Sequence, residues 1–396
     1  ARTMLGAIAT ASFTATTVAF SIIMVAVIQT ANAYSPRLLQ LYFRNEGNQH
    51  VLGILSGTFV YALIVLRAID ATGTEPFVPS LATNGALLLA LVATAAFIYF
   101  INHAAQSIRV GNIITDILGE AEELIDGDRI FPETLGRAWP AAGAPPMPDV
   151  PWAAYRTEEG GYIKTVESDT LLEAASEADA IVRLECTVGD YVLPGMRLAV
   201  IFPSGALSGE LEKALEEAIH IGKQRTLAYD ITFAIRQLTD IAVRALSPGI
   251  NDPSTAWHCI SALSLLLTEI SRHGPVSPYR CDEEGHLRVV APAPIFSEML
   301  QTAFSQIRHY AAGDTDTLIR LLHAYHAIGQ VVSRPKEKEA LWRQVLYLME
   351  TADVSVETDG DRARLNRAYS SIAATFGEGA DGAPLESVWS SDDVVY

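Results

Sequence analysis

The chain has 396 residues, of which 49% are hydrophobic and 19% charged, and a mean hydropathy of +0.22, so it is more apolar than an ordinary soluble enzyme. The charge is uneven, because residues 1–103 carry a formal net charge of +1 and residues 104–396 one of −19. An acidic excess of this size argues against nucleic acid or an anionic lipid surface as the partner of the second part, although it can also serve solubility alone.

The three cysteines, Cys186, Cys259 and Cys281, are scattered along the chain. Their spacing matches neither a disulfide framework nor a zinc site, and a sparse, odd number suits a reducing compartment. We therefore expect no structural metal and no disulfide.

Three segments are apolar enough to cross about 30 Å of hydrocarbon, which takes roughly 20 helical residues. We expect these transmembrane helices at about residues 4–33, 51–67 and 82–103. The first contains no charged side chain.

Charges between these segments predict their orientation. Arg37 and Arg44 follow the first segment, whereas the loop at 68–81 carries two acidic residues and no basic one. By the positive-inside rule, residues 104–396 then lie in the cytoplasm and loop 68–81 outside. Arg67 opposes this count, but an arginine at a helix end can extend its charged group to the interface.

This orientation places Ala1 on the outer side of the membrane. A protein that begins in the cytoplasm then needs an odd number of earlier crossings, most simply one. We therefore expect four spans in the natural protein, the first of them upstream of this sequence.

The first apolar segment carries a stripe of hydroxyl side chains. Thr10, Thr14, Thr17 and Ser21 recur at i, i+4, i+7 and i+11, which places them on one side of a helix. Such a stripe can let helices pack closely in lipid. Alternatively, it can line a water-filled path. The sequence leaves both interpretations open.

The overall prediction is a membrane α-helical bundle followed by a cytoplasmic α+β domain with a small β module and a mostly helical remainder. The expected order after the last span is a helix extending into the cytoplasm (104–137), a Pro- and Ala-rich linker (138–160), the β module (161–205), the helical domain (206–376) and an acidic tail (377–396).

Within the β module, strands are expected at 161–167, 180–188 and 196–202, with a short helix after the first. The run VGDYVLPGMRLAVI resembles one half of a biotinyl- or lipoyl-type barrel-sandwich module. It departs from the carrier version because no lysine stands in a nearby hairpin, so we expect no swinging-arm cofactor, and no other cofactor is indicated.

A periodic helix is expected over residues 226–247, with an apolar face formed by Leu227, Ile231, Ala234, Leu238, Ile241, Ala245 and Leu246. A polar sector runs beside that face and includes Thr226, Asp230, Gln237, Asp240 and Arg244. This sector is either an ordinary ion-paired or subunit-facing surface or a ligand site.

Pro248 and Gly249 end this helix, and Asp252 with Pro253 begins the next one as N-cap and first helical residue. Free backbone N–H groups there, beside Asn251, Ser254 and Thr255, can also hold an anion. Asp252 competes for the same donors, so plain capping is the alternative.

The sequence contains no Gly-rich phosphate loop, no G-x-S-x-G elbow and no metal-ligand spacing. Histidines such as His103, His220, His258 and His273 are isolated from one another. We therefore predict that the protein is not an enzyme.

Three stretches carry a resemblance to a known family: YSPRLLQLYFRNEGNQHVLGILSGTFVYALIVLR, FIYFINHAAQSIRV and RTLAYDITFAIRQLTDIAVRALSPGINDPSTA. They resemble the bacterial predicted membrane proteins catalogued as domain of unknown function 2254. The resemblance implies a bacterial inner-membrane protein with four predicted spans and a large soluble part. It implies no activity.

Two functions remain as hypotheses. The first is a homo-oligomeric, channel-like pore with a large cytoplasmic domain, suggested by the hydroxyl stripe and by a bundle too small for a transporter with inverted repeats. The alternative is a membrane-anchored scaffold or sensor without transport activity. Expected partners are lipid and further copies of the chain, and no nucleic acid.

Overall fold

The computed structural model describes residues 1–33, 46–69, 79–107, 109–126, 137–138, 145–274, 277–376 and 385. The chain divides into two compact units, Ala1–Ile113 and Ile114–Tyr396. Predictions on residues 34–45, most of loop 68–81 and nearly all of the tail 377–396 lie outside the described residues.

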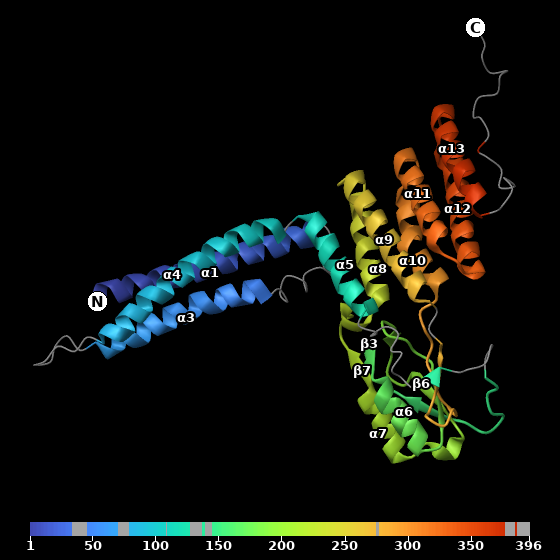
Figure 1. Cartoon of the computed structure of the whole chain (residues 1–396), viewed down its shortest axis with the longest axis horizontal. Helices are drawn as coiled ribbons and strands as arrows, with labels where there is room; N and C mark the ends of the chain where they lie inside the picture. The colour runs from blue at the N-terminus through green and yellow to red at the C-terminus, as the bar shows by residue number, and fades with distance from the viewer. Residues whose placement is uncertain are drawn as a thin grey trace, which may run out of the picture. The chain divides into compact units, whose positions relative to one another are not determined.

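Three long apolar helices make up most of the first unit: α1 (Arg2–Ala33), α3 (Glu46–Ala68) and α4 (Ser80–Ser107) (Figure 1). Each contains a stretch long and apolar enough to cross a membrane, and these are the three such helices among the described residues. The three predicted spans are therefore confirmed as helices, although α3 begins five residues before the expected start at residue 51.

Buried contacts fix how these helices run. Leu5 near the start of α1 packs with Val65 at the end of α3 and Ala86 at the start of α4. At the other end of the bundle, Ile23 packs with Leu55 and with other residues of α3 and α4. Thus α1 and α4 run in the same direction and α3 runs against both. Several large apolar side chains of these helices are exposed, as lipid contact requires: Phe13, Phe20, Ile28, Ile64, Leu88, Leu91 and Ile98.

The third span does not continue as one helix over 104–137. Helix α4 ends at Ser107, and a separate helix, α5, runs from Val110 to Asp126. Its first turn starts where the N–H of Asn112 donates to the carbonyl of Arg109. The prediction was wrong because an apolar face with helical period continues through such a break, so periodicity alone does not reveal it.

The second unit contains two small β-sheets built from short strands. They are β1 (Arg137–Ala138), β2 (Ala153–Arg156), β3 (Gly161–Val166), β4 (Ile181–Leu184), β5 (Tyr191–Val192), β6 (Arg197–Phe202), β7 (Ile219–Gly222), β8 (Tyr279–Cys281) and β9 (Leu287–Val290). Among described residues, one sheet has the order β1-β8-β9-β4-β6-β2 and the other β5-β3-β7. The pair β4–β9 is parallel and the other neighbours are antiparallel.

These pairings change the predicted boundaries. Residues 153–156, expected in a linker, form edge strand β2 on β6. Strands β7, β8 and β9, expected inside the helical domain, complete both sheets, so residue 205 does not separate a β module from a helical domain. The reason is physical: a short edge strand is stabilised by a partner far away in sequence, and local patterns do not contain that partner.

Helices α6 (Ser168–Glu177) and α7 (Gly209–Ala218) pack against each other and cover this β core. Leu171 of α6 and Leu215 of α7 share one apolar cluster with residues of both sheets, among them Val182, Val192 and Ile201. Strand β6 is buried from its second residue onward. The two sheets and two helices therefore enclose a single core.

The remaining helices form a two-layer array of three hairpins (Figure 1). The described helices of the array are α8 (Ile231–Ala245), α9 (Pro253–His273), α10 (Phe296–Tyr310), α11 (Thr315–Val331), α12 (Pro335–Ser355) and α13 (Asp359–Phe376). In one layer α10 packs against α8 and α12, and in the other α11 packs against α9 and α13. Stacking of this kind lets each hairpin bury its apolar face on its neighbours.

Candidate functional site

A tight turn between β4 and β5 carries the Gly-Asp motif of the β part. Gly189 has φ +94°, a left-handed conformation that favours glycine, and its N–H donates to the carbonyl of Ile163. One carboxylate oxygen of Asp190 accepts from both the N–H and the hydroxyl of Thr187, at 2.7 and 3.0 Å. The turn is thus fixed by its own residues and by β3.

Asp230 is the N-cap of α8 rather than a residue on its face, because the helix begins at Ile231. One of its oxygens accepts from the N–H of Phe233 at 3.0 Å and from the hydroxyl of Thr232 at 2.7 Å. The other accepts from Nε and Nη2 of Arg225 at 2.8 and 2.6 Å, and the guanidinium also lies 5.2 Å from the centre of the Phe233 ring. The carboxylate is 3% exposed, so burial, a cap and an ion pair coincide in one residue.

The Gly189 turn lies directly against this pair. A Cβ atom at position 189 would be 2.5 Å from Oδ2 of Asp230 and 2.6 Å from Nη2 of Arg225. Glycine is required there for both the conformation and the space. The Gly189-Asp190 turn and the Asp230 cap, which are separate in the sequence, are therefore in contact in the fold.

A cavity of about 150 Å³ adjoins this contact, and we call it the Asp230 cavity. Its walls come from β3, α6, the β4–β5 turn, the start of α8 and the segment 291–294. Apolar lining residues include Leu171, Leu172, Val188, Ile231 and Val289, and polar ones include Thr165, Ser168, Thr187, Thr232 and Arg280. The cavity is therefore lined mainly by apolar side chains, together with several hydroxyl groups and the charged groups of Asp230 and Arg280, which is the usual make-up of a small-molecule site.

Cys186 also lines the cavity, but it is not a nucleophile. Burial, with help from Asp190 and Glu185, raises the pKa of its thiol to about 12. The thiol is therefore protonated near neutral pH, and a thiolate is the reactive form. The described lining contains no histidine to act as a base. The described lining therefore offers no thiolate near neutral pH, and it offers apolar contacts and hydrogen-bonding groups to a ligand.

The other residues of the predicted polar sector on α8 do not join this site. Asp240 pairs with Arg236 at 2.8 Å, as expected for an i, i+4 pair. Gln237 is buried, and its Oε1 has no hydrogen-bond partner among the described residues. Arg244 lies in the last turn of α8, roughly 20 Å along the helix axis from Asp230 at 1.5 Å per residue.

Asp252 caps α9 at that far end. Its Oδ1 accepts from the N–H of Thr255 at 3.2 Å, and its Oδ2 accepts from the hydroxyl of the same residue at 2.6 Å. Pro253 opens the helix, and Asn251 before it has φ +50°. Ser254 is exposed. The Asp252 carboxylate thus occupies the Thr255 N–H that a bound anion would need. The geometry fits plain helix capping by Asp252.

In the first unit, the four hydroxyl residues Thr10, Thr14, Thr17 and Ser21 are exposed. The hydroxyls of Thr14, Thr17 and Ser21 donate to the carbonyls four residues earlier, at 2.8 to 3.1 Å. Two other hydroxyl residues of α1, Ser12 and Thr30, are the buried ones. The stripe is therefore separate from the packing surface of α1 against α3 and α4.

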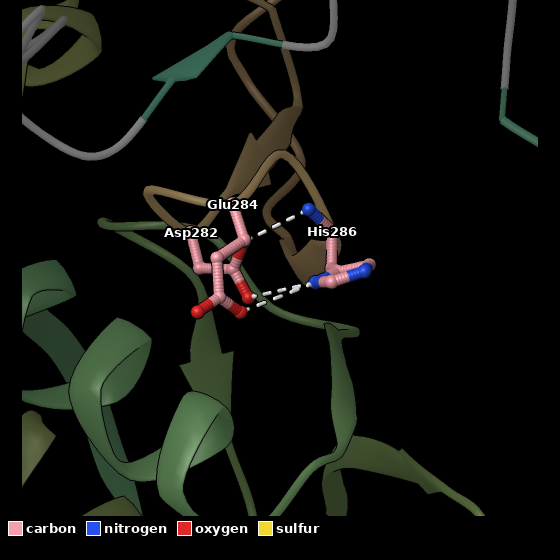
Figure 2. A group of neighbouring side chains, drawn as sticks. All are labelled: Asp282, Glu284 and His286. Carbon is pink, nitrogen blue, oxygen red and sulfur yellow. Dashed lines mark hydrogen bonds and ion pairs between the residues drawn. The ribbon is translucent and has the colours of Figure 1, made fainter.

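The β8–β9 hairpin holds a group that no sequence motif indicated, because Asp282, Glu284 and His286 approach one another there (Figure 2). Nδ1 of His286 is 3.5 Å from Asp282 and 3.6 Å from Glu284. Imidazole and carboxylate are divalent-metal ligands. However, Asp282 already accepts from the backbone N–H of His286 at 2.8 Å and from Nε of Arg288 at 2.7 Å.

Arg288 also determines the electrostatics of this hairpin. Burial alone would raise the pKa of Asp282, but the Arg288 guanidinium and the His286 N–H outweigh it, so that the pKa is lowered. A cation would have to bind beside that guanidinium. We therefore interpret the group as a hydrogen-bonded turn. Only the short D-x-E-x-H spacing could have drawn attention to it in the sequence.

These features define a membrane protein with three apolar helices and a second, mostly helical unit that contains a small mixed sheet. The chain belongs to the family described as predicted membrane protein DUF2254, whose model matches residues 1–327. Uncharacterised proteins of Mycobacterium tuberculosis and Mycobacterium bovis are 31% identical to it over 370 residues, covering 92% of this chain and 70% of each relative. No solved structure matches the chain.

Proposed function

We propose that the protein is a membrane-anchored sensor or scaffold without catalytic activity, whose second unit binds a small molecule in the Asp230 cavity. The apolar helices serve as the anchor. This proposal takes the second of the two hypotheses drawn from the sequence and gives it a site.

The cavity is the observation that carries the proposal. Its volume of about 150 Å³ is roughly ten times the space that one water needs, and an apolar cavity of about this size accepts a benzene-sized molecule. Apolar walls with hydroxyl groups nearby favour a ligand of few heavy atoms, mainly apolar, with one or two hydrogen-bonding groups. Because the cavity touches the start of α8, a ligand there would bias the packing of the β part on the helical array.

A screen of small aromatic and short-chain molecules by thermal shift tests the proposal on the purified full-length chain. A ligand should raise the melting temperature, by an amount that grows with its concentration over Kd. Replacing Ala291, which lines the cavity, with leucine should abolish that shift. Ala363→Leu, at an exposed position on α13, should keep it.

A shift that survives in Ala291→Leu would mean that the ligand binds elsewhere, which would count against the proposed site. Failure of the whole screen, followed by native mass spectrometry that finds no small molecule carried through purification, would remove the support for a sensor.

For the second unit, we propose a cytoplasmic location at a bacterial inner membrane. Arg37, Arg44 and Arg109 on one side of the spans, against Asp70 and Glu75 on the other, support this orientation through the positive-inside rule. The mycobacterial relatives support the bacterial membrane.

A homo-oligomeric pore is the second candidate function. The exposure of Thr10, Thr14, Thr17 and Ser21 on α1 favours it, since this face is free to meet another subunit. It ranks lower because the hydroxyls of Thr14, Thr17 and Ser21 donate to carbonyls of their own helix, so these donors need no water or partner. Conductance in planar bilayers that is lost in Thr14→Leu/Thr17→Leu, with the oligomer intact, would favour the pore. A chain that stays monomeric in nanodiscs would exclude it.

A further inference from the structure

Asn366 of α13 holds the backbone of Leu385, 19 residues further along the chain. Its Nδ2 donates to the carbonyl of Leu385 at 2.9 Å, and the N–H of Leu385 donates to its Oδ1 at 2.8 Å. Leu385 is 8% exposed, so its side chain is buried although it lies beyond the end of the last helix.

These two hydrogen bonds match the side chain of Asn366 to the main chain of a single residue. A carboxamide offers one donor and one acceptor side by side, and the N–H and carbonyl of a single residue point the same way when the chain is extended. Asn366 therefore recognises an extended main chain whatever its side chain, while the buried leucine supplies the side-chain preference. Main-chain bonds combined with a pocket for one side chain are a general mode of peptide recognition.

The charges near Asn366 and in the C-terminal segment indicate, independently of the hydrogen bonds, that the bound peptide is acidic. Arg367, next to Asn366, has no ion-pair partner among the described residues, whereas Arg364 is paired with Asp316 and Asp361. The sequence 377–396 contains five acidic residues and no basic one, and Glu386 directly follows Leu385. An exposed arginine next in sequence to Asn366 thus favours an acidic peptide.

We propose that α13 carries a docking site for an extended, acidic, leucine-containing peptide, and that the chain's own Leu385 occupies it as an intramolecular ligand. This inference is independent of the Asp230 cavity and goes beyond the function proposed above. An occupant tethered by so short a connection has a high effective concentration, of the order of millimolar, so a free peptide must compete with it.

The test uses full-length protein in detergent and a fluorescent synthetic peptide with the sequence of residues 380–391, ADGAPLESVWSS. Leu385→Asp removes the chain's own leucine from the site, so this variant should bind the peptide at least about ten times more tightly than the wild type does. Adding Asn366→Asp, which has the same shape but no donor, should weaken that binding at least about tenfold. Adding Ser371→Ala, whose hydroxyl bonds only to its own helix at Ala368, should leave it unchanged.

Equal melting temperatures of the variants, measured by circular dichroism, establish that the changes act on the site and not on the fold. Absence of peptide binding by Leu385→Asp would overturn the proposal, as would equal binding by Leu385→Asp with and without Asn366→Asp. Wild-type binding as tight as that of Leu385→Asp would overturn the intramolecular occupant. Loss of an oligomer in Leu385→Asp would also overturn it, by assigning the site to the segment of a second copy.

Discussion

Gly189 and Asp230 stand so close that a Cβ atom on the glycine would lie 2.5 Å from the buried carboxylate. The glycine belongs to a turn between two strands, and the aspartate is the residue that starts α8. This contact joins the β part of the second unit to the start of its helical array. The cavity that we propose as a ligand site lies beside it.

Gly189→Ala should destabilise the second unit strongly, by about 2 kcal/mol or more, because it adds both a positive-φ strain and a clash with Asp230 and Arg225. Gly195→Ala is the matched control: it also has a positive φ, +84°, but nothing lies within 4 Å of its Cβ position. The control should lose only about 1 kcal/mol. Urea denaturation of both variants measures the difference, and equal losses would contradict the close contact.

Asp230→Ala should cost about 3 kcal/mol or more, since it removes a cap and leaves Arg225 without its carboxylate in a mostly buried place. Asp252→Ala should cost about 1 kcal/mol, the usual loss for a helix cap alone. Comparing melting temperatures of the two variants checks this order. A similar effect from both would mean that the Arg225 pair contributes little.

The orientation can be tested with an impermeant thiol reagent in intact cells. A cysteine in place of Thr74 should be labelled, and one in place of Lys213, whose side chain is 75% exposed, should react only after permeabilisation. The native Cys281 is a poor reporter because it is fully buried and burial raises the pKa of its thiol. Labelling at position 213 alone in intact cells would reverse the proposed topology.

Thr14→Leu/Thr17→Leu should leave the helix packing of the first unit intact, because both hydroxyls are exposed and bond within α1. Ser12→Leu should disturb it by about 1–3 kcal/mol, since the larger side chain must enter a filled contact between helices. Protease resistance of the helices in nanodiscs distinguishes the two. Equal resistance of Ser12→Leu and wild type would contradict the position of α1.

Acid should weaken the β8–β9 hairpin. The pKa of Asp282 is lowered in the folded chain, so its contribution to stability is fully present above the unfolded pKa of about 3.9 and is lost as pH falls through the lower folded value. Arg288→Met should remove this contribution at neutral pH and reduce the acid sensitivity of hydrogen exchange in the hairpin. A chelator should leave the melting temperature of the wild type unchanged, whereas a fall that zinc reverses would make the group a metal site.

Helix starts and apolar spans were predictable because their causes are local. Twenty apolar residues require burial in lipid or core wherever they occur, and an Asp-Pro pair favours a helix start whatever surrounds it. The spans in α1, α3 and α4 and the Asp252 cap of α9 follow from such patterns. Helices α10 to α13 likewise lie inside the segment that the sequence predicted as a helical domain.

The arrangement of these elements depends on pairs of residues far apart in the chain, and the tertiary structure alone decided it. Strands β2 and β7 are short, and their stability comes from β6 and β3, which local propensity does not reveal. Asp230 looked like one member of a polar helix face, yet it caps α8, pairs with Arg225 and lies against Gly189 beside a cavity. The sequence by itself determined where most helices lie and which of them are apolar enough to cross a membrane, since burial of apolar surface acts along a local period. The site was decided by packing, since only the folded chain brings residue 189 to residue 230.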